Sequence, residues 1–179
     1  MNQAQPPIAP SPISQQPMSA ILSDLILDVD HIAIAVKDIE ASTRWYSEAL
    51  GFSLIDRHVT RGEHTSMLYA VMKAGQSVVV LLQGTEPESQ VSRFIAEFGS
   101  GVHHIAFAVS DLDKAISKAN EAGSVSDTPV VSDDGIRQIF FQRDPDTGVR
   151  IELIERSGDA FSENNVEQLF RVMEEKGLR

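Results

Sequence analysis

Two histidines and one glutamate stand in strand-like segments of the sequence and carry side chains that bind metals. His31 precedes the apolar run 32–36, and His104 precedes the run 105–109. Glu152 interrupts an otherwise apolar segment, where a carboxylate is costly unless it is paired or bound to a metal. Two histidines and one carboxylate form the facial ligand set of non-haem Fe(II) oxygenases, which leaves three coordination positions for substrate and O2.

The two histidines belong to a duplicated segment. Residues 30–38 and 103–111 begin 73 positions apart, and each contains a polar residue, a histidine, an apolar run ending in valine and an aspartate. Each segment predicts a strand followed by an aspartate that begins a helix. We therefore expect His31 and His104 to point into one cavity. His103 should face the opposite way, because side chains alternate along a strand.

The strands that close the two repeats align as well. Residues 79–83 match residues 151–155, because the two segments follow their histidines at intervals that differ by one residue. This alignment puts Val80, which cannot bind a metal, at the position equivalent to Glu152. Glu155 is predicted to lie on the other face, as a solvated residue at the end of its strand. A lone histidine in a strand is usually structural, but two at matching positions beside a carboxylate favour a ligand set.

The hydrophobic periodicity predicts the element order βαβββ, repeated once and followed by a closing helix. The expected strands are 29–36, 52–59, 65–73, 76–83, 101–109, 128–131, 136–142 and 148–154. The expected helices are 38–50, a short one within 84–98, one from 111 to Gly123, and one from about 165. A module of this size leaves one sheet face uncovered. Pairing two modules covers that face and leaves a concave site between them.

The chain therefore divides into four predicted parts. Residues 1–25 are rich in proline, glutamine and serine, which is typical of a disordered tail. Residues 26–98 form the first module with its linker helix, residues 99–157 form the second module, and residues 158–179 carry the closing helix. The predicted fold class is α+β, with two paired modules in a mixed sheet and a C-terminal helix.

The overall composition excludes several classes of protein. The chain has 179 residues, 42% hydrophobic residues, a net charge of −11 and no cysteine. The charge argues against nucleic acid and anionic membranes as partners, and the lack of cysteine excludes thiolate metal sites. No apolar run approaches the roughly 18–20 residues of a membrane span, and the N-terminus does not resemble a secretory signal. We expect a cytoplasmic protein.

Four segments of the sequence resemble the vicinal-oxygen-chelate superfamily, which includes glyoxalase I, methylmalonyl-CoA epimerase, extradiol dioxygenases and 4-hydroxyphenylpyruvate dioxygenase. The segments are 30–36, 45–52, 101–107 and 151–155. The resemblance covers about residues 27–157. It implies paired βαβββ modules that form a cupped sheet around one divalent metal, held here by His31, His104 and Glu152.

Within that superfamily the sequence is most similar to 4-hydroxyphenylpyruvate dioxygenase. The isomerase branches have a fourth ligand, glutamate or glutamine, where this chain has Val80. The segment Gln138 to Phe140 resembles that enzyme's substrate-facing strand, which implies that Gln138 is a catalytic and substrate-orienting residue and Phe140 a stacking wall. Residues 156–170 resemble that enzyme's C-terminal stretch and lid helix. The resemblance implies that the pocket is lined or covered by Phe161, Val166, Leu169 and Phe170.

The resemblance implies a non-haem Fe(II)-dependent dioxygenase, an oxidoreductase that acts on a 2-oxo acid with O2 as second substrate. Co2+, Ni2+, Mn2+ or Zn2+ are the alternative metals. The sequence departs from the family in four ways. It has two modules instead of four, a short interval from His104 to Glu152, His103 in place of the usual glutamine, and Val166 in place of a phenylalanine. Because of these departures, the substrate could also be an aliphatic or differently shaped 2-oxo acid.

Two other functions remain open. One is a metal-dependent epimerase or isomerase of the methylmalonyl-CoA epimerase or glyoxalase type, which needs a base to move a proton. His58, Glu63 and His64 lie in the right region to supply a base, although each also fits a solvent-facing position. The second is a binding module without a metal. The presence of His31, His104 and Glu152 counts against that function. Homodimerisation is compatible with modules of this kind.

Overall fold

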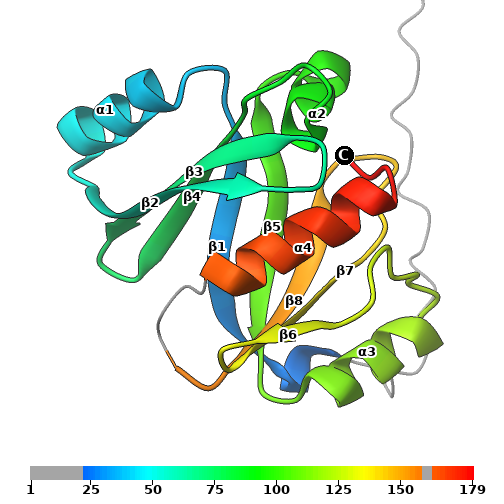
Figure 1. Cartoon of the computed structure of the whole chain (residues 1–179). Coiled ribbons are helices and arrows are strands. Elements are labelled where there is room, and N and C mark those ends of the chain that lie inside the picture. The colour runs from blue at the N-terminus through cyan, green and yellow to red at the C-terminus, as the bar shows by residue number, and fades with distance from the viewer. Residues whose placement is uncertain (1–21, 159–162) are drawn as a thin grey trace, which may run out of the picture.

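The computed structural model describes residues 22–158 and 163–179, which form one strongly curved sheet with helices on both faces (Figure 1). The eight strands have the order β2-β3-β4-β1-β5-β8-β7-β6. The first module supplies β1 (Ile26–Ala35), β2 (Ser53–Arg61), β3 (Ser66–Ala74) and β4 (Ser77–Gly84). The second supplies β5 (Gly101–Val109), β6 (Val131–Asp133), β7 (Ile136–Phe140) and β8 (Arg150–Arg156).

The two modules meet at the centre of the sheet. Strands β1 and β5 pair in antiparallel fashion, β4 lies parallel to β1, and β8 lies parallel to β5. The outer strands of each half are antiparallel to their neighbours. This arrangement confirms the predicted α+β fold with paired modules. The first strands of the two repeats, which carry the two candidate histidines, are therefore direct neighbours.

The helices begin where the sequence placed their capping residues. Helix α1 (Ile39–Leu50) starts after Asp38, whose side chain accepts a hydrogen bond from Ala41 N, and α3 (Leu112–Glu121) starts after Asp111. Each helix is also held by the last strand of its own module. Gln83 Oε1 accepts from Ile39 N at 2.7 Å, and Glu155 Oε2 accepts from Leu112 N at 2.8 Å. The prediction of a merely solvated Glu155 is thus wrong, because its carboxylate caps a helix.

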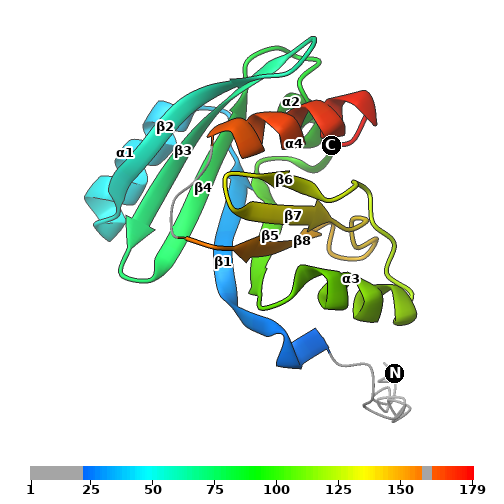
Figure 2. The ribbon, with the colours of Figure 1, turned by 60° about the horizontal axis from the view of Figure 1, so that its bottom comes forward.

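Successive side chains along each strand point to opposite faces of the sheet, and each face carries its own apolar layer. Helices α1 and α3 cover the outer face, where Met72 and Leu81 pack against Ile39, and Leu153 packs beneath α3. Helices α2 (Gln90–Phe98) and α4 (Glu163–Glu175) lie on the inner face, where Phe170 packs with residues of β1, β3 and β4. Helix α4 crosses the open side of the cup and contacts β2 in one half and β6 in the other (Figures 1 and 2).

Several predicted boundaries differ from the structure. Residues 128–130 do not form a strand, because Thr128 Oγ1 accepts from Phe140 N at 3.0 Å and the pairing of β6 with β7 begins only at Val131. The closing helix starts at Glu163, two residues before the predicted start. A 3-10 turn over Leu22–Asp24 replaces the last part of the predicted tail, and residues 1–21 lie outside the described residues.

Candidate metal centre

The three candidate ligands converge on the inner face of the sheet. His31 Nε2 lies 3.2 Å from His104 Nε2 and 3.6 Å from Glu152 Oε2, and His104 Nε2 lies 3.3 Å from the same oxygen. The three residues come from β1, β5 and β8, which the sheet order makes adjacent. All three side chains are buried, and Glu152 is only 1% exposed. Strands that are far apart in the sequence thus bring three donor atoms to one point.

The spacing of these donor atoms fits a single ion. Ligands roughly 2.1 Å from a common ion lie roughly 3.0 Å apart in octahedral and roughly 3.4 Å apart in tetrahedral geometry. Two of the observed separations, 3.2 and 3.3 Å, lie within that range, and the third, 3.6 Å between His31 Nε2 and Glu152 Oε2, exceeds it by about 0.2 Å. Glu152 Oε1 is buried and has no hydrogen-bond partner among the described residues. An unpaired buried carboxylate oxygen beside two imidazoles is a donor set that suits a divalent cation.

Burial controls the charge of this cluster in the absence of an ion. Desolvation raises the pKa of Glu152 to about 7, more than the attraction of His31 lowers it. Burial also holds the pKa of His104 well below its usual range, and the neighbouring His103 and His31 add to that shift. Metal ligands must be neutral imidazole and ionised carboxylate, so a bound cation would favour the charged form of Glu152.

His31 is oriented by an ion pair behind it. His31 Nδ1 donates to Asp30 Oδ1 at 2.7 Å, and Arg156 donates from Nε to Asp30 Oδ2 at 2.6 Å and from Nη2 to Oδ1 at 2.9 Å. Burial by itself would raise the pKa of Asp30, but the hydrogen bonds from His31 and Arg156 outweigh it and the net shift is downward. Asp30 is therefore ionised and holds the His31 ring in one orientation.

His103 faces the same cavity as His104, so the prediction of opposite faces is wrong. Ala33 pairs with His104 and Ile34 pairs with Val102, which leaves His103 as an extra residue in a β-bulge. The bulge cancels the alternation at this point. His103 is 3% exposed, its Nδ1 lies 2.8 Å from His104 Nδ1, and its Nε2 has no hydrogen-bond partner among the described residues.

A mainly apolar pocket surrounds the candidate ligands. Both modules and helix α4 contribute side chains to it. Phe140 packs edge-on against the His104 ring, with 4.9 Å between ring centroids. The lining consists of His31, Met67, Tyr69, Val80, Leu82, Gln90, Val91, His103, His104, Ile136, Gln138, Phe140, Glu152, Arg156, Asn165, Val166, Leu169, Phe170 and Met173.

Most of the predicted substrate residues belong to this lining. Gln138 and Phe140 on β7 are buried, and Val166, Leu169 and Phe170 reach the pocket from α4. Phe161 lies outside the described residues. The assignment of these side chains to a substrate stays a prediction, which their position in the pocket wall permits.

Sequence reasoning missed two polar residues of the pocket. Tyr69 is 2% exposed and Gln90 is 4% exposed, and the hydroxyl of Tyr69 and Oε1 of Gln90 have no hydrogen-bond partner among the described residues. Tyr69 pairs with Leu82, whereas Gln138 pairs with Ile154, the equivalent residue of the second module. Extending the internal alignment to the third strand of each module would have identified Tyr69 as the counterpart of Gln138.

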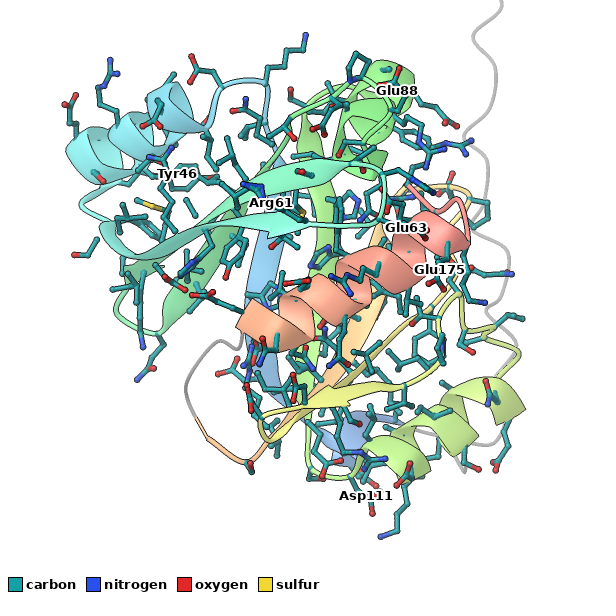
Figure 3. The ribbon with its side chains drawn as sticks, viewed as in Figure 1. Tyr46, Arg61, Glu63, Glu88, Asp111 and Glu175 are labelled. Atoms are coloured by element: carbon teal, nitrogen blue, oxygen red, sulfur yellow. The ribbon has the colours of Figure 1, made fainter. Side chains whose placement is uncertain are left out.

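The three candidate bases of the epimerase alternative lie outside the pocket lining. The His58 ring lies beside Tyr69 of the pocket wall, with 5.6 Å between ring centroids, and its nitrogens pair with carboxylates: Nε2 is 2.6 Å from Asp56 Oδ1 and Nδ1 is 2.8 Å from Glu163 Oε1. Glu63 and His64 are exposed in the turn between β2 and β3, and Glu63 lies next to the C-terminal half of α4 (Figure 3). The structure thus brings together the three candidate metal ligands but not these candidate bases.

No helix within residues 22–158 and 163–179 is long and apolar enough to cross a membrane.

YwkD, an uncharacterized protein of Bacillus subtilis (strain 168), is 34% identical to this chain over 134 residues, which are 74% of this chain and 99% of that protein. A Streptomyces coelicolor methylmalonyl-CoA epimerase variant in complex with 2-nitronate-propionyl-CoA is 30% identical, with a TM-score of 0.61 over 74% of this chain and 99% of the epimerase.

A second solved structure shares the fold over more of the chain. A 4-hydroxymandelate synthase variant from Streptomyces coelicolor has a TM-score of 0.75 at 18% identity and matches 84% of this chain. The chain spans about half, 54%, of that synthase. The sequence pattern described as the Glyoxalase/Bleomycin resistance protein/Dioxygenase superfamily matches residues 28–153. With its duplicated βαβββ modules, the chain therefore belongs to the glyoxalase/bleomycin resistance protein/dioxygenase superfamily.

Proposed function

We propose that this protein is a metal-dependent dioxygenase that acts on a 2-oxo acid. The observation that carries the proposal is the number of protein donors at the cluster. His31, His104 and Glu152 provide three, and Val80 occupies the equivalent position in the first module. Three protein ligands leave room on the ion for both a chelating substrate and O2. A fourth protein ligand, as in the isomerase branches, would take one of those positions.

The residues around the cluster would bind and orient the substrate. Gln138 offers a polar contact beside the ligands, Phe140 offers a flat apolar wall, and Phe170, Leu169 and Val166 close the pocket from α4. This lining suits a small carboxylate with an apolar body, and the covering helix keeps water away from the reacting atoms. A bound Fe(II) would supply the Lewis acidity and the redox chemistry that no side chain of this chain can supply.

The choice of iron over other metals follows from the proposed reaction and from the donor set. Two imidazoles and one carboxylate also bind Co2+, Ni2+, Mn2+ and Zn2+, so affinity alone does not select the metal. O2 chemistry requires a redox-active ion. We therefore propose Fe(II) as the working metal of a cytoplasmic enzyme, with a homodimer as its compatible assembly.

The second candidate function is a metal-dependent epimerase or isomerase. The 30% identity to a methylmalonyl-CoA epimerase favours it. Two features of the pocket count against it. His58, Glu63 and His64 are absent from the lining, and α4 lies across the open side of the cup, which leaves less room for a bulky thioester such as acyl-CoA. The absence of a positioned base among these three residues is the stronger of the two arguments.

Anaerobic loading with Fe(II), followed by O2 uptake with a panel of 2-oxo acids, tests the proposal. We expect substrate-dependent O2 consumption that the Glu152→Ala variant lacks, while Glu155→Ala, changed on the outer face of the same strand, retains it. Absence of uptake, together with Co2+-dependent or Ni2+-dependent proton exchange on acyl-CoA esters, would replace the dioxygenase by the isomerase. Absence of any metal binding would reject both functions.

A further inference from the structure

Each histidine of the candidate metal centre is hydrogen bonded to the side chain of the residue directly before it. His31 Nδ1 pairs with Asp30 Oδ1 at 2.7 Å, and His104 Nδ1 pairs with His103 Nδ1 at 2.8 Å. In both modules the other ring nitrogen, Nε2, points toward Glu152. The duplicated sequence has thus kept the same partner position in both modules, but the chemistry of the partner differs.

The direction of the second hydrogen bond follows from what a metal ligand requires. A neutral imidazole that offers the Nε2 lone pair to a cation carries its proton on Nδ1. His104 Nδ1–H is then the donor, and Nδ1 of His103 must be the acceptor. A neutral His103 that accepts at Nδ1 carries its own proton on Nε2.

We propose that His103 is a positioning residue that fixes the tautomer and the ring orientation of His104 for metal binding. His103 accepts a hydrogen bond from Nδ1 of His104, as the Asp30 carboxylate accepts one from Nδ1 of His31. The acceptor is a neutral imidazole in the first case and an anion in the second. The proposal rests on the metal-binding part of the proposed function, and it holds whether the bound metal serves an oxygenase or an isomerase.

The local structure holds His103 rigidly enough for this role. The β-bulge turns both rings to the inner face, which regular alternation would prevent. Arg143 Nη1 donates to the backbone oxygen of His103 at 3.1 Å, and Phe94 packs edge-on against the His103 ring with centroids 4.9 Å apart. The same tautomer leaves the Nε2–H of His103 on the pocket wall, where it has no hydrogen-bond partner among the described residues.

Two variants of nearly equal size separate hydrogen bonding from packing. In His103→Asn the amide oxygen takes the place of Nδ1 and can still accept from His104, whereas His103→Leu removes the acceptor. Co2+ titration of the metal-free full chain is the measurement, with the visible spectrum as a second readout. We expect His103→Asn to bind Co2+ within about threefold of the natural protein and His103→Leu to bind it about 10–100-fold more weakly. Equal losses in both variants would overturn the proposal.

Nitrogen-15 NMR of the natural protein loaded with Zn2+ reads the tautomers directly and does not depend on the folding of a variant. We expect a proton on Nδ1 of His104 and on Nε2 of His103. A proton on Nδ1 of His103 would overturn the proposal. If the natural protein bound neither Co2+ nor Zn2+, the proposed function would fail too. If it bound them and His103→Leu bound them equally well, only the role of His103 would fail.

Discussion

Val80 and Glu152 occupy equivalent positions in the two halves of the sheet. Val80 pairs with Ala33, two residues after His31, and Glu152 pairs with Ala106, two residues after His104. Both side chains line the pocket, but only Glu152 carries a donor atom. The internal symmetry of the fold therefore offers four equivalent positions for ligands, and three of them carry a candidate metal ligand.

A carboxylate at position 80 should convert the three-ligand cluster into a four-ligand cluster. We expect Val80→Glu to bind Co2+ or Ni2+ at least about tenfold more tightly, because the new side chain adds a charged donor to a preformed site. We also expect loss of O2 uptake, since one open coordination position is filled. The same change should lower the Tm of the metal-free protein, because the carboxylate is buried.

Val80→Leu serves as the matched apolar control and should change neither metal affinity nor O2 uptake by more than a small factor. Tighter metal binding without loss of uptake would show that the fourth position is not needed for the reaction. Unchanged affinity in Val80→Glu would contradict the equivalence of the two positions.

Removal of the charge at Glu152 should separate metal binding from folding. Glu152→Gln keeps the shape of the side chain but loses the anion, so we expect Co2+ affinity to fall by about 100-fold or more. The Tm of the metal-free variant should equal or exceed that of the natural protein, because a buried carboxylate with an unpaired oxygen is no longer present. Calorimetric titration and thermal unfolding check the two parts. A lower Tm would mean that the carboxylate stabilises the fold even without a metal.

The carboxylate of Glu174 joins helix α4 to the turn between β2 and β3 of the first module. Glu174 accepts hydrogen bonds from the backbone N of Glu63 at 2.6 Å, of His64 at 3.1 Å and of Thr65 at 2.8 Å, and from Thr65 Oγ1 at 2.6 Å. Burial would raise the pKa of Glu174, but these bonds outweigh it and lower the pKa below the usual 4.5. Because the pKa of Glu174 is lower in the folded than in the unfolded protein, its stabilisation is complete above the unfolded pKa of about 4.5. The stabilisation is lost as the pH falls from there through the lower folded pKa.

The Glu174→Ala change should therefore destabilise the protein in a pH-dependent way. At pH 7 we expect a loss of about 1 kcal/mol, since the four donors lose a charged acceptor at a partly exposed site. Below the folded pKa of Glu174 the difference from the natural protein should vanish. Urea unfolding at several pH values measures it. The neighbouring Glu175→Ala is the control, and a pH-independent difference in Glu174→Ala would contradict the role of the charge.

Gly62 permits the close approach of α4 to the turn between β2 and β3. A Cβ atom at this position would lie 2.9 Å from Cε1 of Phe170, which is buried, and would also meet the Glu174 carboxylate. We expect Gly62→Ala to lower stability by about 1–3 kcal/mol and to speed hydrogen exchange in Glu163–Glu175, because the helix must move outward. Gly101→Ala, where a Cβ would meet no atom within 4 Å, is the control. Unchanged hydrogen exchange in Glu163–Glu175 would show that α4 accommodates the added Cβ without moving outward.

The sequence by itself determined the two modules and the candidate ligands. The duplicated segment around His31 and His104 fixed the strand–helix order, because an apolar run that ends at a capping aspartate has few other solutions. Glu152 was identifiable because a charge inside an apolar strand is too costly to lack a partner. Tyr69 was identifiable in principle from the same alignment. These are local signals, which a chain carries before it folds.

The tertiary structure alone decided which side chains meet. The β-bulge at His103 turned that ring into the pocket, and no residue type in the strand signals the loss of alternation. The anchoring of α4 by Glu174, 109 residues after Thr65, depends on how the closing helix crosses the cup. Glu155 became a helix cap rather than a solvated end, because α3 folds back over its strand. Such long-range contacts are set by the packing of whole elements, which local sequence patterns do not encode.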